Sequence, residues 1–238
     1  NWHIAMTTTR DFLEFTPGRT ISPPGYCSPG NVICHEGKWV MSAQRYPWPA
    51  AIVLLESPDL VHWSEPREVI GARTTTFWCE RHGPIDGFLF RWQERNYLLF
   101  TNETTTVKAQ QVGLAVSDGL DDFELLTRDR PLLNSRQYDA AHGVENCSIL
   151  VQGNELHLFL SVGMAEQKVA MLTSQDLFHW PRLGSDGEIK GLNQEWSRHC
   201  ACAQFVVDWR RELGSYVMMY MGCRHKDSFE RLALGMAT

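Results

Sequence analysis

Residues 57–63 read Ser-Pro-Asp-Leu-Val-His-Trp, and residues 174–180, 117 positions later, read Ser-Gln-Asp-Leu-Phe-His-Trp. Looser copies stand at residues 9–15 and 117–123. Asp59 and Asp176 are expected to cap tight turns, and Trp63 and Trp180 are expected to pack between structural units. A segment that returns in this way indicates an array of similar units.

A second series of matches gives the length of the unit. Bulky runs follow polar turns at residues 39–41, 97–99, 156–158 and 216–218, with steps of 58, 59 and 60 residues. The turns, such as residues 35–38, 152–155 and 212–215, separate short apolar runs, and no stretch keeps an apolar stripe at helical spacing. A four-stranded unit of roughly 60 residues is typical of a propeller blade. The sequence therefore predicts an all-β β-propeller.

The expected strands are unequal in number. First strands are expected at residues 31–34, 88–90, 148–151 and 205–207, whereas third strands are expected five times, near Ile4, Val53, Leu114, Ala170 and Leu234. This count predicts a five-bladed propeller with an incomplete first blade, whose inner strand would lie roughly 20 to 30 residues before Asn1. A four-bladed ring closed by pairing of the two ends is the alternative.

The chain is expected to form a single propeller domain. Its expected divisions are residues 1–20 for the end of the first blade, then 21–70, 71–130, 131–190 and 191–238 for successive blades. Because an incomplete blade exposes unpaired backbone, residues 2–6 should meet residues 232–236, another chain or residues outside this sequence. A homo-oligomer formed through this edge is one version of that expectation.

Composition excludes some classes of partner. The 238 residues are 43% hydrophobic, with a net charge of −6 and a pI near 5.8, which disfavours nucleic acid and anionic membranes but suits neutral sugars. No apolar run approaches the roughly 18 to 20 residues of a membrane span, and no signal peptide is visible. A soluble protein is expected; its compartment stays open, with the free cysteines favouring the cytoplasm.

The seven cysteines are odd in number and show no disulfide framework, so buried free thiols are expected. Cys200 and Cys202, next to His199, would suit a metal, but no second cysteine pair stands at zinc-finger spacing. No cofactor is therefore expected, although a central structural calcium would be compatible with a propeller.

Two carboxyls stand at the same apparent position of the repeat. Asp86 lies eleven residues before Tyr97, and Glu145 lies eleven residues before Leu156. Tyr97 and Leu156 are each the first residue of a bulky run. On neighbouring inner strands, both would face the crowded axis, where a carboxyl is costly unless it meets solvent, a partner or a ligand. Such a pair raises the pKa of one member and meets a requirement of glycoside hydrolysis. The alternative is that each only accepts hydrogen bonds in a water-filled channel.

Residues 83–90, Gly-Pro-Ile-Asp-Gly-Phe-Leu-Phe, and 143–148, Gly-Val-Glu-Asn-Cys-Ser, together with the turn segments, resemble the five-bladed β-propeller glycoside hydrolases. These are the arabinanase and β-xylosidase family 43, with relatives in families 32 and 117, and the resemblance spans nearly the whole chain. It implies that Glu145 is the general acid and that Asp86 orients and tunes it. The first-blade Asp of these families, a base or nucleophile, has no counterpart here, because its strand should precede Asn1.

The resemblance implies a glycoside hydrolase acting on furanosyl or xylosyl glycosides (arabinoside, xyloside or fructoside), if the first-blade Asp comes from outside this chain. The alternatives are a catalytically inactive carbohydrate-binding propeller and a protein-interaction propeller. Loops at the axial rim carry aromatic and hydrogen-bonding side chains that suit a sugar ring. The expected substrate-binding residues are His142, Arg81, His82, Trp78, Tyr46, Trp48, His199 and Arg198. His142 stands first, since some relatives place a His beside the acid.

Overall fold

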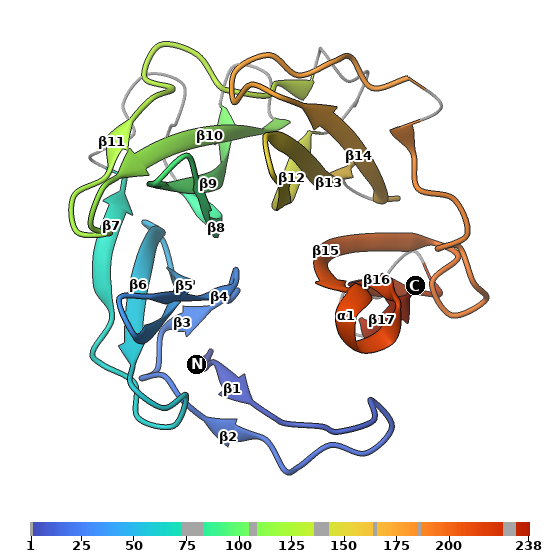
Figure 1. Cartoon of the computed structure of the whole chain (residues 1–238), viewed down its shortest axis with the longest axis horizontal. Coiled ribbons are helices and arrows are strands. Elements are labelled where there is room, and N and C mark those ends of the chain that lie inside the picture. Colours follow the sequence, from blue (N-terminus) through green and yellow to red (C-terminus); the bar gives the residue numbers. More distant parts are fainter. Residues whose placement is uncertain are drawn as a thin grey trace.

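The chain forms a ring of antiparallel sheets around a common axis in this computed structural model (Figure 1). The structure describes residues 2–72, 83–104, 109–135, 143–163, 166–184, 187–225 and 232–238. Strands dominate these residues, which confirms the expected all-β propeller; the number of blades stays a prediction. No helix in the described ranges is long and apolar enough to cross a membrane.

The sheets follow one another along the chain. The first contains β1 (Ala5–Met6) and β2 (Arg19–Thr20), and the second contains β3 (Tyr26–Cys27), β4 (Val32–His35), β5 (Lys38–Arg45), β6 (Ala51–Ser57) and β7 (Arg67–Gly71). The third contains β8 (Ile85–Trp92), β9 (Arg95–Thr104), β10 (Ala109–Ser117) and β11 (Glu124–Leu125). The last two contain β12 (Val144–Gln152), β13 (Glu155–Val162) and β14 (Lys168–Ser174), then β15 (Cys200–Trp209), β16 (Ser215–Cys223) and β17 (Ala233–Ala237).

Strands β4, β8, β12 and β15 lie nearest the axis, and each pairs with the next strand along the chain (Figure 1). Three of them start three to five residues before the expected first strands, so that Asp86 and Glu145 fall within β8 and β12. The third strands near Val53, Leu114 and Ala170 are confirmed as β6, β10 and β14, as is that near Leu234, β17. The turn expected at residues 212–215 is instead closed by the short helix α1 (Arg210–Leu213).

The repeated aspartates cap their turns as expected. Asp59 and Asp176 each accept the backbone N–H of the residue two positions later, at 2.8 and 2.7 Å, and each lies 2.7 Å from the ring Nδ1 of the histidine three positions later. Trp63 and Trp180 each donate the indole N–H to the backbone carbonyl three positions earlier and pack against the core. These local hydrogen bonds explain why the segment recurs at the end of the third strand.

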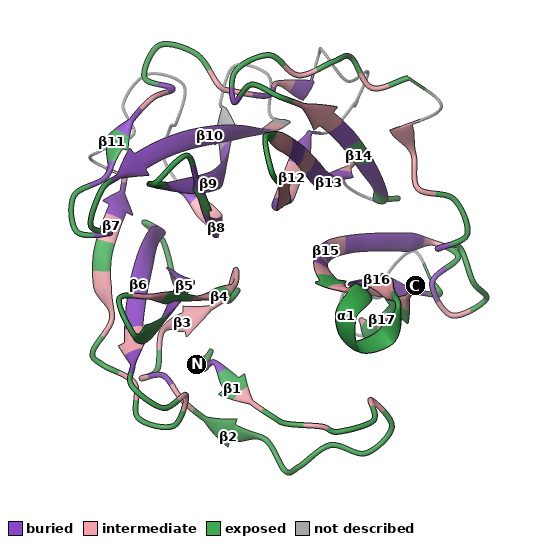
Figure 2. Cartoon of the chain, in the orientation of Figure 1, coloured by how far each residue is buried: buried purple, intermediate pink, exposed green. Residues whose placement is uncertain are grey.

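The core lies between neighbouring sheets, where most of the middle strands and large parts of β8, β12 and β15 are buried, whereas β4 is exposed or half-buried (Figure 2). Asn31 fastens two sheets together, because its side chain accepts the N–H of Leu89 at 2.8 Å and donates to the Leu89 carbonyl at 2.7 Å. Nearby, the Ser42 hydroxyl donates to the carbonyl of Gly87 at 2.8 Å. These contacts fix β8 against the preceding sheet.

The two ends of the ring meet through side chains. Within the described residues, no ladder joins residues 2–6 to residues 232–236, since β1 pairs with β2 and β17 pairs with β16. Instead, the ring of Phe12 lies 5.3 Å from that of Trp209 at the end of β15.

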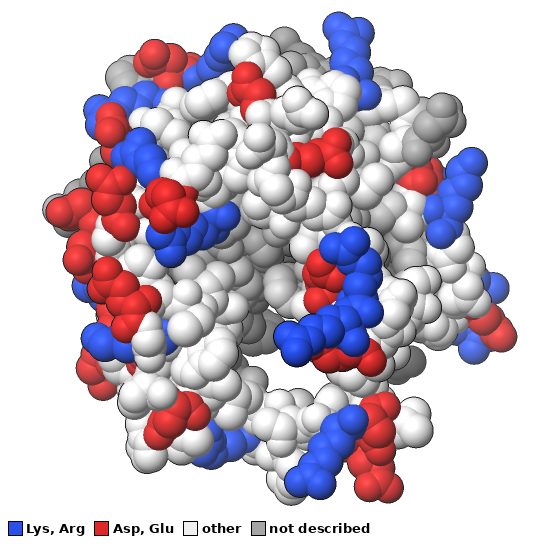
Figure 3. Space-filling model, viewed as in Figure 1, with Lys and Arg blue, Asp and Glu red and all other residues white. Residues whose placement is uncertain are grey.

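The face that carries α1 shows basic and acidic side chains interspersed, with a hollow near the middle of the ring (Figure 3), as expected for a solvated surface.

Candidate active site

A β-bulge shapes the backbone at each inner strand of the last three sheets. In β8, Ile85 pairs with Thr101 and Phe88 pairs with Leu99, so Asp86 and Gly87 together stand opposite one residue, Phe100. Corresponding bulges follow residue 145 in β12 and residue 202 in β15. Asp86 has a φ of +52°, a left-handed conformation typical of a bulge residue. Such bulges re-aim side chains, and here they occur at the axis.

The expected equivalence of Asp86 and Glu145 is wrong by one residue. The bulge residues with left-handed backbone are Asp86, Asn146 and Ala203, at φ values of +52°, +51° and +48°. Asp86 therefore corresponds to Asn146, and Glu145 corresponds to Ile85 in the preceding sheet. The apolar run in β9 is buried on both faces of its sheet, so its first residue does not mark the register of the strand pair.

A cavity of about 540 Å³ lies at the axis, among the inner strands β4, β8, β12 and β15. Asp86, Asn146 and Ala203 line it together, so the bulges bring their side chains to one hollow. Further lining residues are Ser28, Asn31, Phe88, Cys147, Gln204, Phe205, Met219 and Met221. The cavity thus combines a carboxyl, amides and apolar walls, a mixture that suits a small polar ligand.

The two carboxyls are electrostatically coupled. Burial raises the pKa of Glu145 to about 8, the negative charge of Asp86 adds to the rise, and a hydrogen bond from Gln167 opposes it. Burial likewise raises the pKa of Asp86 to about 6. The rise is larger for Glu145 than for Asp86, so Glu145 keeps its proton to a higher pH. This difference gives the two carboxyls distinct chemistry in one site.

The other expected site residues fall into two groups. Tyr46 and Trp48 lie in the loop between β5 and β6, with ring centroids 6.2 Å apart in an edge arrangement, and Trp48 is exposed. Arg198 is exposed and His199 is partly buried just before β15, where the His199 N–H donates to the carbonyl of Cys223 at 3.1 Å. Four further expected residues lie outside the described part of the chain: Arg81, His82, Trp78 and His142.

Sequence reasoning missed two glutamines that contact Glu145. Gln167, just before β14, donates its side-chain Nε2–H to Oε1 of Glu145. The side chain of Gln110 in β10 acts on the same carboxyl and lowers its pKa. Gln167 is 4% exposed. No motif marks either residue, because a polar residue at the start of a strand is common in any β protein.

Three thiols gather beside this site. Cys200, Cys202 and Cys223 are buried together, and Sγ of Cys200 lies 3.5 Å from Sγ of Cys202. Hydrogen bonds from Cys202 and Cys223 lower the pKa of Cys200 to about 7 against the effect of burial, and negative charge on Cys200 in turn raises the pKa of Glu145. Among the described residues, no group of His, Cys, Asp and Glu is arranged to hold a metal ion.

The expectation of buried free thiols is confirmed for these three cysteines and for Cys147. It is wrong for Cys34, which is exposed on β4, and Cys27 is half-buried.

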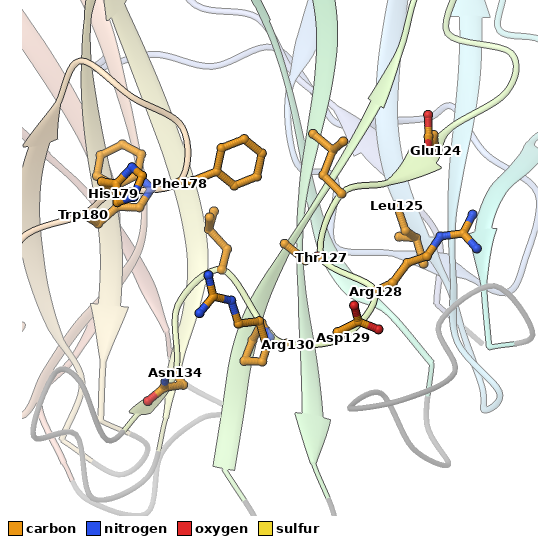
Figure 4. Close-up of a pocket in the computed structure, with 13 residues that line it drawn as sticks. Glu124, Leu125, Thr127, Arg128, Asp129, Arg130, Asn134, Phe178, His179 and Trp180 are labelled. Carbon is orange, nitrogen blue, oxygen red and sulfur yellow. The ribbon is translucent and has the colours of Figure 1, made fainter.

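A second hollow of about 640 Å³ lies away from the axis, between residues 124–134 and the turn at Phe178 to Trp180 (Figure 4). Arg128, Asp129 and Arg130 stand on one side of it, and Phe178 projects from the other (Figure 4). None of the expected site residues lines it, so the axial cavity remains the candidate site.

Comparison with known proteins finds similarity in structure alone. No family model matches the sequence, and no curated protein matches it. An exo-1,5-α-L-arabinanase from a bovine ruminal metagenomic library superposes with a TM-score of 0.72 at 18% identity, over 97% of this chain and 84% of that chain. A thermostable family 43 glycoside hydrolase gives a TM-score of 0.63 at 18% identity, over 92% of this chain and 71% of its own.

The GH32 β-fructofuranosidase of Bombyx mori gives a TM-score of 0.68 at 18% identity, over 91% of this chain. This chain spans about half of that enzyme, 47% of its length. A family 117 glycoside hydrolase from Zobellia galactanivorans is also similar, with a TM-score of 0.61. The chain therefore has the fold of the β-propeller glycoside hydrolases of families 32, 43 and 117.

Proposed function

We propose that this chain binds a furanosyl or xylosyl glycoside (an arabinoside, xyloside or fructoside) in the axial cavity and takes part in its hydrolysis. The observation that carries the proposal is a pair of partly buried carboxyls that interact electrostatically, Asp86 at the cavity wall and Glu145. The named substrates of the structural neighbours, arabinan and fructofuranosides, support this substrate class.

In the proposed reaction, Glu145 is the general acid. Its pKa of about 8 keeps the carboxyl protonated at neutral pH, so it can give a proton to the leaving-group oxygen as the glycosidic bond breaks. Asp86, with a pKa of about 6, stays ionised, and its charge helps to keep the proton on Glu145 until the leaving group accepts it. Hydrolysis also needs a carboxyl base or nucleophile on the opposite side of the sugar.

The second candidate is a carbohydrate-binding propeller without turnover. Among the described residues that line the cavity, Asp86 is the only carboxyl, and the corresponding bulge positions in β12 and β15 are Asn146 and Ala203. A site with this lining would still hold a sugar by its hydroxyls and apolar face. It would not hydrolyse the sugar without the further carboxyl.

Turnover of aryl arabinofuranoside, xyloside and fructoside by the whole natural protein tests the proposal. Glu145→Gln should abolish turnover while leaving sugar binding largely intact, because the amide keeps the shape and removes only the transferable proton. Glu94→Gln, at a side chain that is 91% exposed on a hairpin turn, is the matched control and should stay fully active. Wild-type protein that binds these sugars without turning them over would decide for the binding propeller, and absence of binding would contradict both.

A further inference from the structure

The two glutamines beside Glu145 occupy the same position of the structural repeat. The hairpin turn between β8 and β9 ends at residue 94, and that between β12 and β13 ends at residue 154. Asn102 and Val162 each lie eight residues further on, and they pair with Gln111 and Lys168 at the start of the third strands. Gln110 and Gln167 are the residues just before these partners. They are thus equivalent, although they lie 57 positions apart in the sequence.

The same position in the other sheets is apolar. Arg45 pairs with Ala51 and Gly222 pairs with Ala233, so the equivalent residues are Ala50 and Leu232. The fold therefore does not require an amide at this position. Among the four third strands that can be compared, amides occur in the two that flank Glu145, which indicates a role at the carboxyl rather than in the scaffold.

The backbone at each glutamine is held by the sheet that follows it. The carbonyl of Gln167 accepts the N–H of Ala201 in β15 at 2.9 Å. Gln110 forms a bridge with Gly143, where an added Cβ would lie 2.6 Å from the Gln110 nitrogen. Since both backbones are anchored to a neighbouring sheet, their side chains approach Glu145 from fixed points on two different blades.

We propose that Gln110 and Gln167 are positioning residues that hold the Glu145 carboxyl between two amide side chains and favour its ionised form. Their N–H donors lower the pKa of Glu145, whereas burial and the negative charges around the carboxyl raise it. Those charges come from Asp86 on β8 and Cys200 on β15, with Cys147 and Cys202 as the other titratable groups coupled to Glu145. The catalytic meaning of this amide pair rests on the proposed function of Glu145; the contact itself does not.

The test follows the ionisation of Glu145 directly, by carbon-13 NMR of protein labelled at glutamate carboxyls, with the signal assigned by its loss in Glu145→Gln. Removing a donor from a carboxylate raises its pKa, so Gln167→Leu and Gln110→Leu should each raise the Glu145 pKa by roughly one unit, and the double variant should raise it further. Gln152→Leu is the matched control. Gln152 lies on β12, the strand that carries Glu145, but its amide donates to the hydroxyl of Tyr216. Its removal should therefore leave the Glu145 pKa unchanged.

Each single variant tests the proposal independently, so one that fails to fold leaves the other decisive. A Glu145 pKa that stays within about 0.3 units of wild type in the folded variants would overturn the proposal. The measurement needs no turnover, so it separates failure of the amide pair from failure of the proposed function. In an active protein, the alkaline limb of the pH–rate profile should shift to higher pH in Gln110→Leu and Gln167→Leu. It should stay at the wild-type pH in Gln152→Leu.

Discussion

The burial of Glu145 predicts that the protein loses stability as the pH rises. The pKa of this carboxyl is about 8 in the folded chain, against 4.5 for an ordinary glutamate. Between these two values the unfolded chain ionises while the folded chain keeps its proton, so the folded state binds more protons and the free energy of unfolding falls with increasing pH. The contribution is fully present below pH 4.5 and is lost as the pH rises through 8.

The two pKa values give the size of the effect. A difference of about 3.5 units, at about 1.4 kcal/mol per unit, corresponds to an upper limit of about 5 kcal/mol. About 4 kcal/mol of this falls between pH 5 and pH 9, because the unfolded glutamate is already mostly ionised at pH 5. An amide at the same position does not titrate. The unfolding free energy of Glu145→Gln should therefore not fall by this amount between pH 5 and pH 9.

Urea unfolding of wild type, Glu145→Gln and Glu94→Gln at pH 5, 7 and 9 measures the difference. Glu94→Gln should lose as much stability between pH 5 and pH 9 as wild type does, because the Glu94 side chain is 91% exposed and an exposed ion pair contributes little to stability. Glu145→Gln should lose less, by up to about 4 kcal/mol. Equal losses in all three proteins would refute the reasoning that Glu145 is buried in its protonated form.

Two other predictions follow from close packing and exposure. Gly30→Ala should prevent stable folding, because its Cβ would lie 1.6 Å from the carbonyl oxygen of Gly87, whereas Gly18→Ala meets nothing within 4 Å and should keep the wild-type melting temperature; equal melting temperatures would contradict the packing at Gly30. A maleimide followed by mass spectrometry should label Cys34 rapidly in the folded protein and Cys147 only after denaturation, and labelling of both at one rate would show that Cys147 is not buried.

Some of the candidate site could be predicted from residues alone. The spacing and surroundings of Asp86 and Glu145 predict that they share one site, and the structure brings their carboxyls close enough to interact. Their exact relation could not be predicted, because each bulge inserts a residue that only strand pairing reveals. Gln110 and Gln167 carried no sequence signal, since an amide becomes informative only when its partner is known.

The sequence by itself determined the all-β repeat and its capped turns. The reason is local: Asp59 and Asp176 bond to backbone groups two or three residues away, and apolar runs bury themselves wherever a sheet forms. Tertiary structure alone decided the ionisation of the site. The pKa of Glu145 depends on burial and on residues of four other strands or loops, including Asp86 and Gln167, which only the closing of the ring brings around one carboxyl.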